Sequence, residues 1–174
     1  MRPGISSYGY PPDPRFRGAL ALRPALTLKA RVGGFQRVLP GESVSYGGLW
    51  TAERETLLAN VQIGYGDGYP RGATGKAQAL VAGELRPVRG RICMDQFMLE
   101  VDGLELGSDA RAHLEVGDEV TLFGPGSLSA SEVAAWVNTI DYEILTRLDA
   151  RRVQRVLLED GVLEDANLET ALER

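Results

Sequence analysis

Two phenols and a carboxylate stand within one glycine-rich turn. The segment "NVQIGYGDGYPRG", residues 60–72, places Tyr65, Asp67 and Tyr69 directly behind a short apolar run. A turn needs only the glycines, whereas a phenol can exchange protons if its site lowers its pKa from about 10. A glycine turn with two packed tyrosines explains the segment as well. The segment lacks the G-x-G-x-x-G register and continues into Pro70, so a dinucleotide site is not expected.

Other reactive residue types are scarce. The only cysteine, Cys93, lies in "RICMDQ", which fits either a core strand that ends in a polar turn or a site. The only histidine, His113, lies in a polar stretch and is expected at the surface. One cysteine and one histidine, 20 residues apart, do not predict a metal site. A single cysteine also excludes a disulfide within the chain and fits a reducing compartment.

The composition indicates one ordinary domain. The chain has 174 residues, a formal net charge of -5 and 44% hydrophobic residues, which suffice for a core. The acidic balance argues against nucleic acid as a partner. No apolar run approaches the roughly 18 residues of a membrane helix, and the opening "MRPGISSYGYPP" has no hydrophobic region of secretory type. We therefore expect a soluble, cytoplasmic protein without membrane or nucleic-acid partners.

The hydrophobic pattern predicts many short strands and one or two helices. Five of the nine prolines fall within residues 1–24, which are expected to form a linker. Period-2 alternation begins at Ala25, and further β-rich runs follow at "ESVSY", "TLLANVQIG", "AQALVAG", "LRPVRGRICM", "QFMLEV" and "DEVTLFG". Ser129 and Glu132 form an S-x-x-E capping box before a helical pattern that reaches Ile140, and "YEILTRL" predicts a second short helix. Residues 158–174 are an acidic tail. We expect a mainly β fold, an antiparallel barrel or sandwich.

Five motifs, taken together, resemble the C-terminal domain of alanine racemase, a pyridoxal phosphate (PLP) enzyme. They are "LRPALTLKARV", "ESVSYGGLW", "IGYGDGYPR", "GRICMDQFML" and "NTIDYEILTRL", in this order. The resemblance runs from residue 2 to about 156, with a β domain at 25–157. It implies that "RPGISSYG" is the last strand of the family's catalytic barrel and that a homodimer forms, in which the β domain completes the partner protomer's site.

By resemblance, Tyr65 is the catalytic base on one face of the substrate alanine, opposite a lysine. Met94, through its backbone N–H, and Asp95 lie beside the substrate carboxylate. Gly64 and Gly66 are then expected to let the turn approach the partner's cofactor closely. Tyr69 keeps its interpretation as a packed or rim tyrosine.

The resemblance also implies a set of cofactor contacts. Tyr142 matches the phosphate-binding tyrosine, although a core position in the second helix explains it too. Gly4 and Ile5 match the positions whose backbone amides hold the phosphate. Arg2 matches the arginine that faces the pyridine nitrogen. Because arginine does not give up its proton, that ring nitrogen would stay unprotonated, which limits side reactions such as transamination.

The Schiff-base lysine that PLP catalysis needs has no good candidate. The chain has two lysines, Lys29 on an outward strand face and Lys76 in "GATGKAQ", and neither resembles the family's cofactor lysine. The family has a barrel upstream of Met1, so we expect a fragment that is inactive alone. A non-catalytic β module that binds a partner or small molecule remains the alternative. A two-domain amino-acid decarboxylase fits worse, because "MDQ" follows Cys93 and "GYGDGYPR" has no counterpart there.

Overall fold

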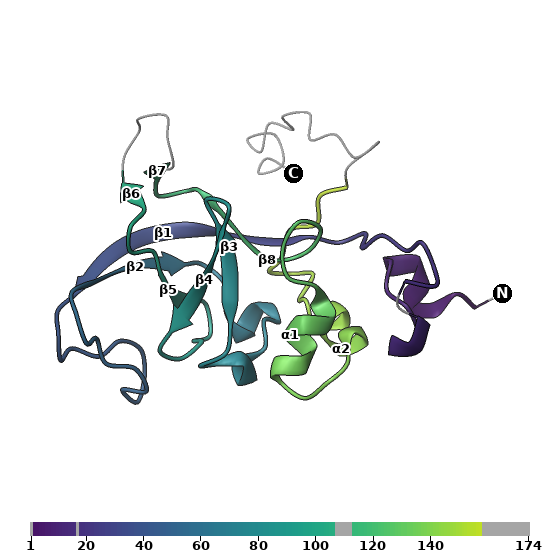
Figure 1. Cartoon of the computed structure of the whole chain (residues 1–174), viewed down its shortest axis with the longest axis horizontal. Helices are drawn as coiled ribbons and strands as arrows, with labels where there is room; N and C mark the ends of the chain where they lie inside the picture. Colours follow the sequence, from purple (N-terminus) through teal and green to yellow (C-terminus); the bar gives the residue numbers. More distant parts are fainter. Residues whose placement is uncertain (1, 17, 107–112, 158–174) are drawn as a thin grey trace.

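Six strands close into an antiparallel barrel in the computed structural model, which describes residues 2–16, 18–106 and 113–157 (Figure 1). Their order around the barrel is β1-β2-β5-β4-β3-β8, and each paired neighbour runs antiparallel. The predicted fold class is confirmed. The bounds are β1 Leu28–Val38, β2 Thr56–Val61, β3 Gln78–Val81, β4 Glu84–Arg89, β5 Phe97–Glu100 and β8 Glu119–Phe123.

The long strand β1 closes the barrel because it has two partners. Its first residues pair with β8 and the remainder pairs with β2, with a register shift between Val32 and Gly34. The predicted period-2 alternation is present, since inward side chains are buried and outward ones such as Lys29 are exposed. The barrel interior buries side chains from all six strands, among them Val32, Val61 and Leu99. Burial of each such aliphatic side chain contributes about 1.5–3 kcal/mol.

Two predicted strands are shorter or missing, for local backbone reasons. The run "LRPVRGRICM" was expected to continue to Met94, but β4 ends at Arg89 because Gly90 turns the chain at a φ of 68°. The expected strand "ESVSY" is also wrong, since this loop contributes only an isolated bridge between Ser43 and Thr51. A two-residue parallel pair, β6 (Glu105–Leu106) with β7 (His113–Leu114), was not predicted.

Two short helices cover one end of the barrel. In α1 (Ala130–Trp136) the predicted capping box is present, with the Ser129 amide donating to Glu132 at 2.7 Å and the Glu132 amide donating back to the Ser129 hydroxyl at 3.2 Å. The helix stops before the expected Ile140 because Asn138 adopts a φ of 55°. The second predicted helix is α2 (Asp141–Thr146). None of the described helices is long and apolar enough to cross a membrane.

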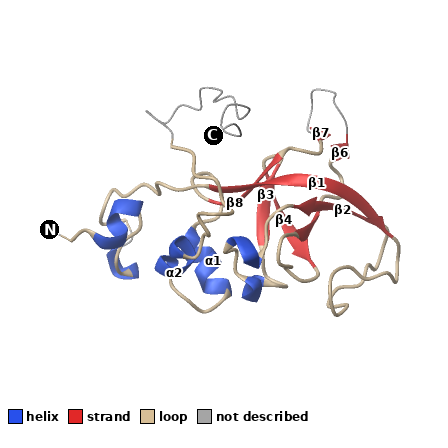
Figure 2. Cartoon of the chain, turned by 180° about the vertical axis from the view of Figure 1, so that it is seen from behind, coloured by secondary structure: helices blue, strands red, loops and turns tan. Residues whose placement is uncertain are grey.

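The N-terminal segment forms two 3-10 helices instead of the strand that the resemblance implied. These are η1 (Gly4–Tyr8) and η2 (Pro14–Phe16), and they lie beyond α1 and α2 at one end of the molecule (Figure 2). Tyr10 anchors them, since its buried hydroxyl lies 3.4 Å from the Ala130 amide at the start of α1. The acidic tail 158–174 and the His113 side chain fall outside the described residues.

Candidate active site

The Tyr65 turn is fastened to the neighbouring loop by backbone hydrogen bonds. After β2 the chain enters the 3-10 helix η3 (Tyr65–Asp67), whose Tyr65 amide donates to the Cys93 carbonyl at 3.0 Å. The Gly66 amide donates to the Met94 carbonyl at 2.8 Å. Segments that are almost thirty residues apart in the sequence are thereby held side by side, and Tyr65 and Met94 lie close together.

The flanking glycines have a role within this chain as well, while their expected role in the approach to the partner's cofactor stays a prediction. A Cβ on Gly64 would lie 2.2 Å from the Cys93 carbonyl oxygen, and one on Gly66 would lie 3.0 Å from that of Met94. The glycines are therefore required by close approach within this chain. Gly68 has a similar role, because its left-handed φ of 102° leaves a Cβ only 2.3 Å from the Arg147 carbonyl oxygen.

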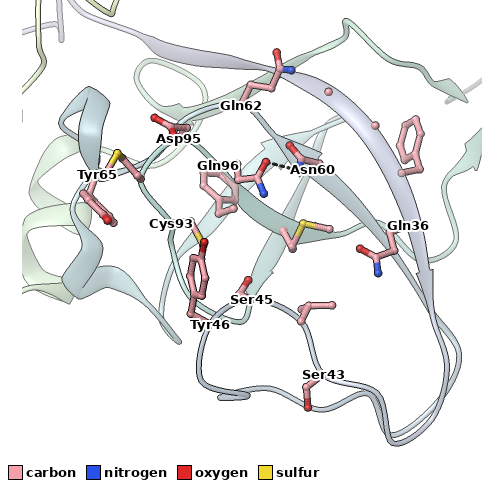
Figure 3. A pocket seen from close by; sticks show the side chains of 17 residues that line it. Gln36, Ser43, Ser45, Tyr46, Asn60, Gln62, Tyr65, Cys93, Asp95 and Gln96 are labelled. Carbon is pink, nitrogen blue, oxygen red and sulfur yellow. Dashed lines mark hydrogen bonds between the residues drawn. The ribbon is translucent and has the colours of Figure 1, made fainter.

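Tyr65, Met94 and Asp95 line one open pocket of about 1230 Å³ on the outer face of β1, β2 and β5 (Figure 3). All three residues are exposed, Tyr65 to 39% and Met94 to 50% of the full residue surface. The three residues that the sequence assigned to base and substrate binding are thus neighbours. Neither the Tyr65 hydroxyl nor the Met94 amide makes a hydrogen bond within the described residues, so both can serve another molecule.

Part of the remaining wall of the pocket is polar and carries amides, beside apolar residues such as Phe35 and Met98. Gln36, Asn60, Gln62 and Gln96 lie around it, and the Asn60 side chain donates to Gln96 at 2.8 Å (Figure 3). Gly33 and Gly34 of β1 also line the pocket and place no side chain in it. The side-chain amides can both donate and accept hydrogen bonds, and they carry no charge.

Tyr69, the second phenol of the opening motif, is a core residue. It is fully buried, and its ring lies 5.8 Å from that of Phe97 between centroids. Burial raises the pKa of its hydroxyl far above the usual value of 10.0. Proton exchange near neutral pH is therefore unfavourable at Tyr69, and its interpretation as a packed tyrosine is confirmed.

The residues assigned to the cofactor lie in the N-terminal segment and in α2, away from the pocket lining. Ile5 is buried in the main core, whereas Arg2 and Gly4 are exposed and Gly4 has a left-handed φ of 57°. Tyr142 occupies the first turn of α2 and is 38% exposed, so its interpretation as a core residue is wrong. None of these four residues lines the pocket at Tyr65.

One residue of the site was missed by the sequence analysis. The Arg152 side chain donates from Nε to Asp67 at 2.9 Å and from a terminal nitrogen to Asp95. These partners are 85 and 57 residues away in the sequence, and Arg152 stands in an arginine-rich stretch without a motif. Nothing in the sequence distinguishes it from its neighbour Arg151.

The fold and this pocket define a β-barrel domain of the alanine racemase type, and comparison with known proteins establishes the family. Residues 25–157 match the family described as "Alanine racemase, C-terminal domain", so the chain belongs to this family. It is 53% identical over 155 residues to the alanine racemase of Deinococcus radiodurans, covering 89% of this chain and 42% of that protein. It is 45% identical over 159 residues to the alanine racemase of Thermobifida fusca, covering 90% of this chain and 40% of that protein.

Solved structures give the same result. Alanine racemase of Clostridium difficile 630 in complex with cycloserine superimposes with a TM-score of 0.80 at 41% identity, over 91% of this chain and 40% of that one. The Bacillus anthracis alanine racemase with bound L-Ala-P gives a TM-score of 0.79 at 35% identity, again over 91% of this chain and 40% of that one. The chain therefore spans about two fifths of the length of the relatives that it matches.

Proposed function

We propose that this chain is the C-terminal part of a cytoplasmic alanine racemase, which interconverts L- and D-alanine with PLP and supplies D-alanine for cell-wall synthesis. The observation that carries the proposal is that Tyr65 and Met94 line the same pocket. Neither the Tyr65 hydroxyl nor the Met94 amide has a hydrogen-bond partner within the described residues. These are the groups needed to move a proton at Cα and to bind a carboxylate.

The residues near the N-terminus fit the phosphate of PLP. The Gly4 and Ile5 amides stand at the start of η1, where a helix leaves its first N–H groups without intrahelical partners. A Cβ on Gly4 would meet no atom within 4 Å, so its backbone is open to approach. Tyr142 offers an exposed phenol, and Arg2 would face the pyridine nitrogen. Once bound, PLP would supply an electron sink that acidifies the substrate Cα–H.

The second base of the two-base mechanism would be a lysine outside this chain. The Lys29 ammonium is paired with Glu119 at 2.5 Å, and that of Lys76 donates to the Trp136 carbonyl at 2.7 Å. Neither lysine lines the pocket. In this scheme Tyr65 exchanges the proton on one face of Cα and the lysine exchanges it on the other.

A homodimer accounts for the two separate residue groups. Tyr65, Met94 and Asp95 line the pocket, whereas Arg2, Gly4, Ile5 and Tyr142 do not. If the first group completes the site of the partner protomer and the second contributes to the site of its own protomer, each chain serves two active sites. The exposed rim at Tyr65 and Met94 is then the surface that meets the partner.

Racemisation by a chimera tests the proposal. This chain replaces the corresponding segment of the Deinococcus radiodurans alanine racemase, and conversion of L-alanine to D-alanine is followed with and without added PLP. We expect PLP-dependent racemisation by the chimera and none by this chain or by the truncated relative alone. A folded chimera that binds PLP and does not racemise alanine would favour the alternative, a non-catalytic β module.

A further inference from the structure

The Arg152 guanidinium connects the two loops that carry the proposed catalytic groups. One carboxylate partner, Asp67, closes the Tyr65 turn, because its other oxygen accepts the Gly64 amide at 2.8 Å. The second partner, Asp95, follows Met94 directly. A terminal nitrogen of Arg152 would also lie 3.1 Å from a Cβ on Gly66, so the guanidinium sits against the turn itself.

The backbone around Arg152 is held against the same turn. The Asp149 amide donates to the Asp67 carbonyl at 3.1 Å, and the Arg152 amide donates to the Asp149 carbonyl at 3.0 Å. Leu148 and Val153 pack on the main core on either side. The side chain therefore leaves a fixed piece of backbone, so its pairing with two carboxylates needs no further ordering of the main chain, and its planar fork limits the rotamer entropy lost per hydrogen bond.

We propose that Arg152 is a positioning residue of the racemase. It fixes the Tyr65 phenol relative to the Met94 amide, and it offsets the negative charges of Asp67 and Asp95 beside the site for the substrate carboxylate. This inference rests on the proposed function. It extends that function by a residue that contacts neither substrate nor cofactor and acts through both rim loops.

Electrostatics and geometry give separate expectations. Without Arg152, two uncompensated carboxylates would lie near the anionic end of alanine, which weakens substrate binding. Without the double hydrogen bond, the turn and the loop would be joined only by their backbone bonds, which loosens the alignment of Tyr65 with Cα. Misplacement by about 1 Å can cost about a hundredfold in rate. A lysine keeps the charge but lacks the planar fork that reaches two carboxylates.

The test compares Arg152→Ala and Arg152→Lys with Arg151→Ala in the racemising chimera. Arg151 is the matched control, because it is the adjacent arginine, is 89% exposed in its side chain and pairs only with Asp149 among the described residues. For Arg152→Ala we expect a raised KM for alanine and a kcat lowered about 10- to 100-fold. For Arg152→Lys we expect KM to recover while kcat stays low. Arg151→Ala should change neither by more than about twofold.

A second readout uses this chain alone and needs no cofactor. In Arg152→Ala, hydrogen exchange at the Tyr65 and Gly66 amides should accelerate by about tenfold or more, while exchange in β1 and β2 stays protected. Unchanged exchange at those two amides would overturn the positioning role, as would kinetics of Arg152→Ala that match Arg151→Ala. If the parent chimera does not racemise alanine, the proposed function fails, and the exchange experiment still decides whether Arg152 holds the two loops together.

Discussion

Gly64 approaches Cys93 so closely that a single methyl group on it would lie 2.2 Å from the Cys93 carbonyl oxygen. The contact is between backbones, so no side-chain rotation can relieve it. The Tyr65 turn and the segment at Cys93 therefore leave no room for a side chain between them at this point.

Gly64→Ala should destabilise the domain by about 1–3 kcal/mol or more, because the added carbon must displace one of the two segments. Gly34→Ala is the control, since a Cβ there meets no atom within 4 Å, and it should change stability by less than about 1 kcal/mol. Urea denaturation of both variants checks this. Equal midpoints would show that the close approach does not constrain the turn.

Tyr65→Phe in the racemising chimera should lower kcat about 10²- to 10⁴-fold, since it removes a proton carrier and keeps the ring. Solvent isotope exchange should be impaired more for one alanine enantiomer than for the other, because each base serves one face of Cα. Tyr69→Phe is the matched control, because that phenol is buried without a hydrogen-bond partner among the described residues. Similar small effects of both variants on kcat would contradict a catalytic role for Tyr65 and leave it a structural residue of the turn.

This chain alone should form no stoichiometric adduct with PLP. Lys29 is paired with Glu119 and Lys76 with the Trp136 carbonyl, and neither lies in the pocket. The check is borohydride reduction after incubation with PLP, followed by peptide mass spectrometry. A single-site adduct at either lysine, together with alanine turnover, would contradict the proposal that the catalytic lysine lies outside this chain.

Stability should fall as the pH rises above about 10, because burial raises the pKa values of Tyr10 and Tyr69 above 10.0. The folded state then retains protons that the unfolded chain releases, so the stabilisation is complete below pH 10 and is lost above it. Each tyrosine contributes at most about 1.4 kcal/mol per pH unit. The double variant Tyr10→Phe/Tyr69→Phe should show a flatter dependence between pH 9 and 11 in urea denaturation. A slope equal to that of the parent would contradict these pKa shifts.

Local patterns predicted much of this structure, and long-range contacts account for what they missed. Alternation located β1, and the S-x-x-E box located α1, since each depends on neighbours in sequence. The end of β4 at Gly90 follows from its left-handed backbone, and glycine alone does not reveal that conformation. The segment that contains η1 is held by Ile5, which is part of the main core, and by Tyr10, whose hydroxyl meets the Ala130 amide 120 residues away.

The site residues also divide into those that local motifs predicted and those that depend on contacts between distant segments. Tyr65, Met94 and Asp95 were found because each belongs to a recognisable motif, and their common pocket fits that assignment. The close contact of Gly64 with Cys93 was not predicted, because the two residues are 29 positions apart in the sequence. Arg152 was missed because its meaning depends on two carboxylates that only the fold brings together.

The double pairing of β1 leaves none of the six barrel strands with an open edge. Unpaired strand edges can pair with another chain and so start aggregation, and a closed barrel has no such edges. We therefore expect little tendency of the barrel strands to form fibrils by edge-to-edge pairing. Any assembly that it forms should instead be reversible and mediated by side chains, with Tyr46 and Met94 as the most exposed apolar groups beside the pocket.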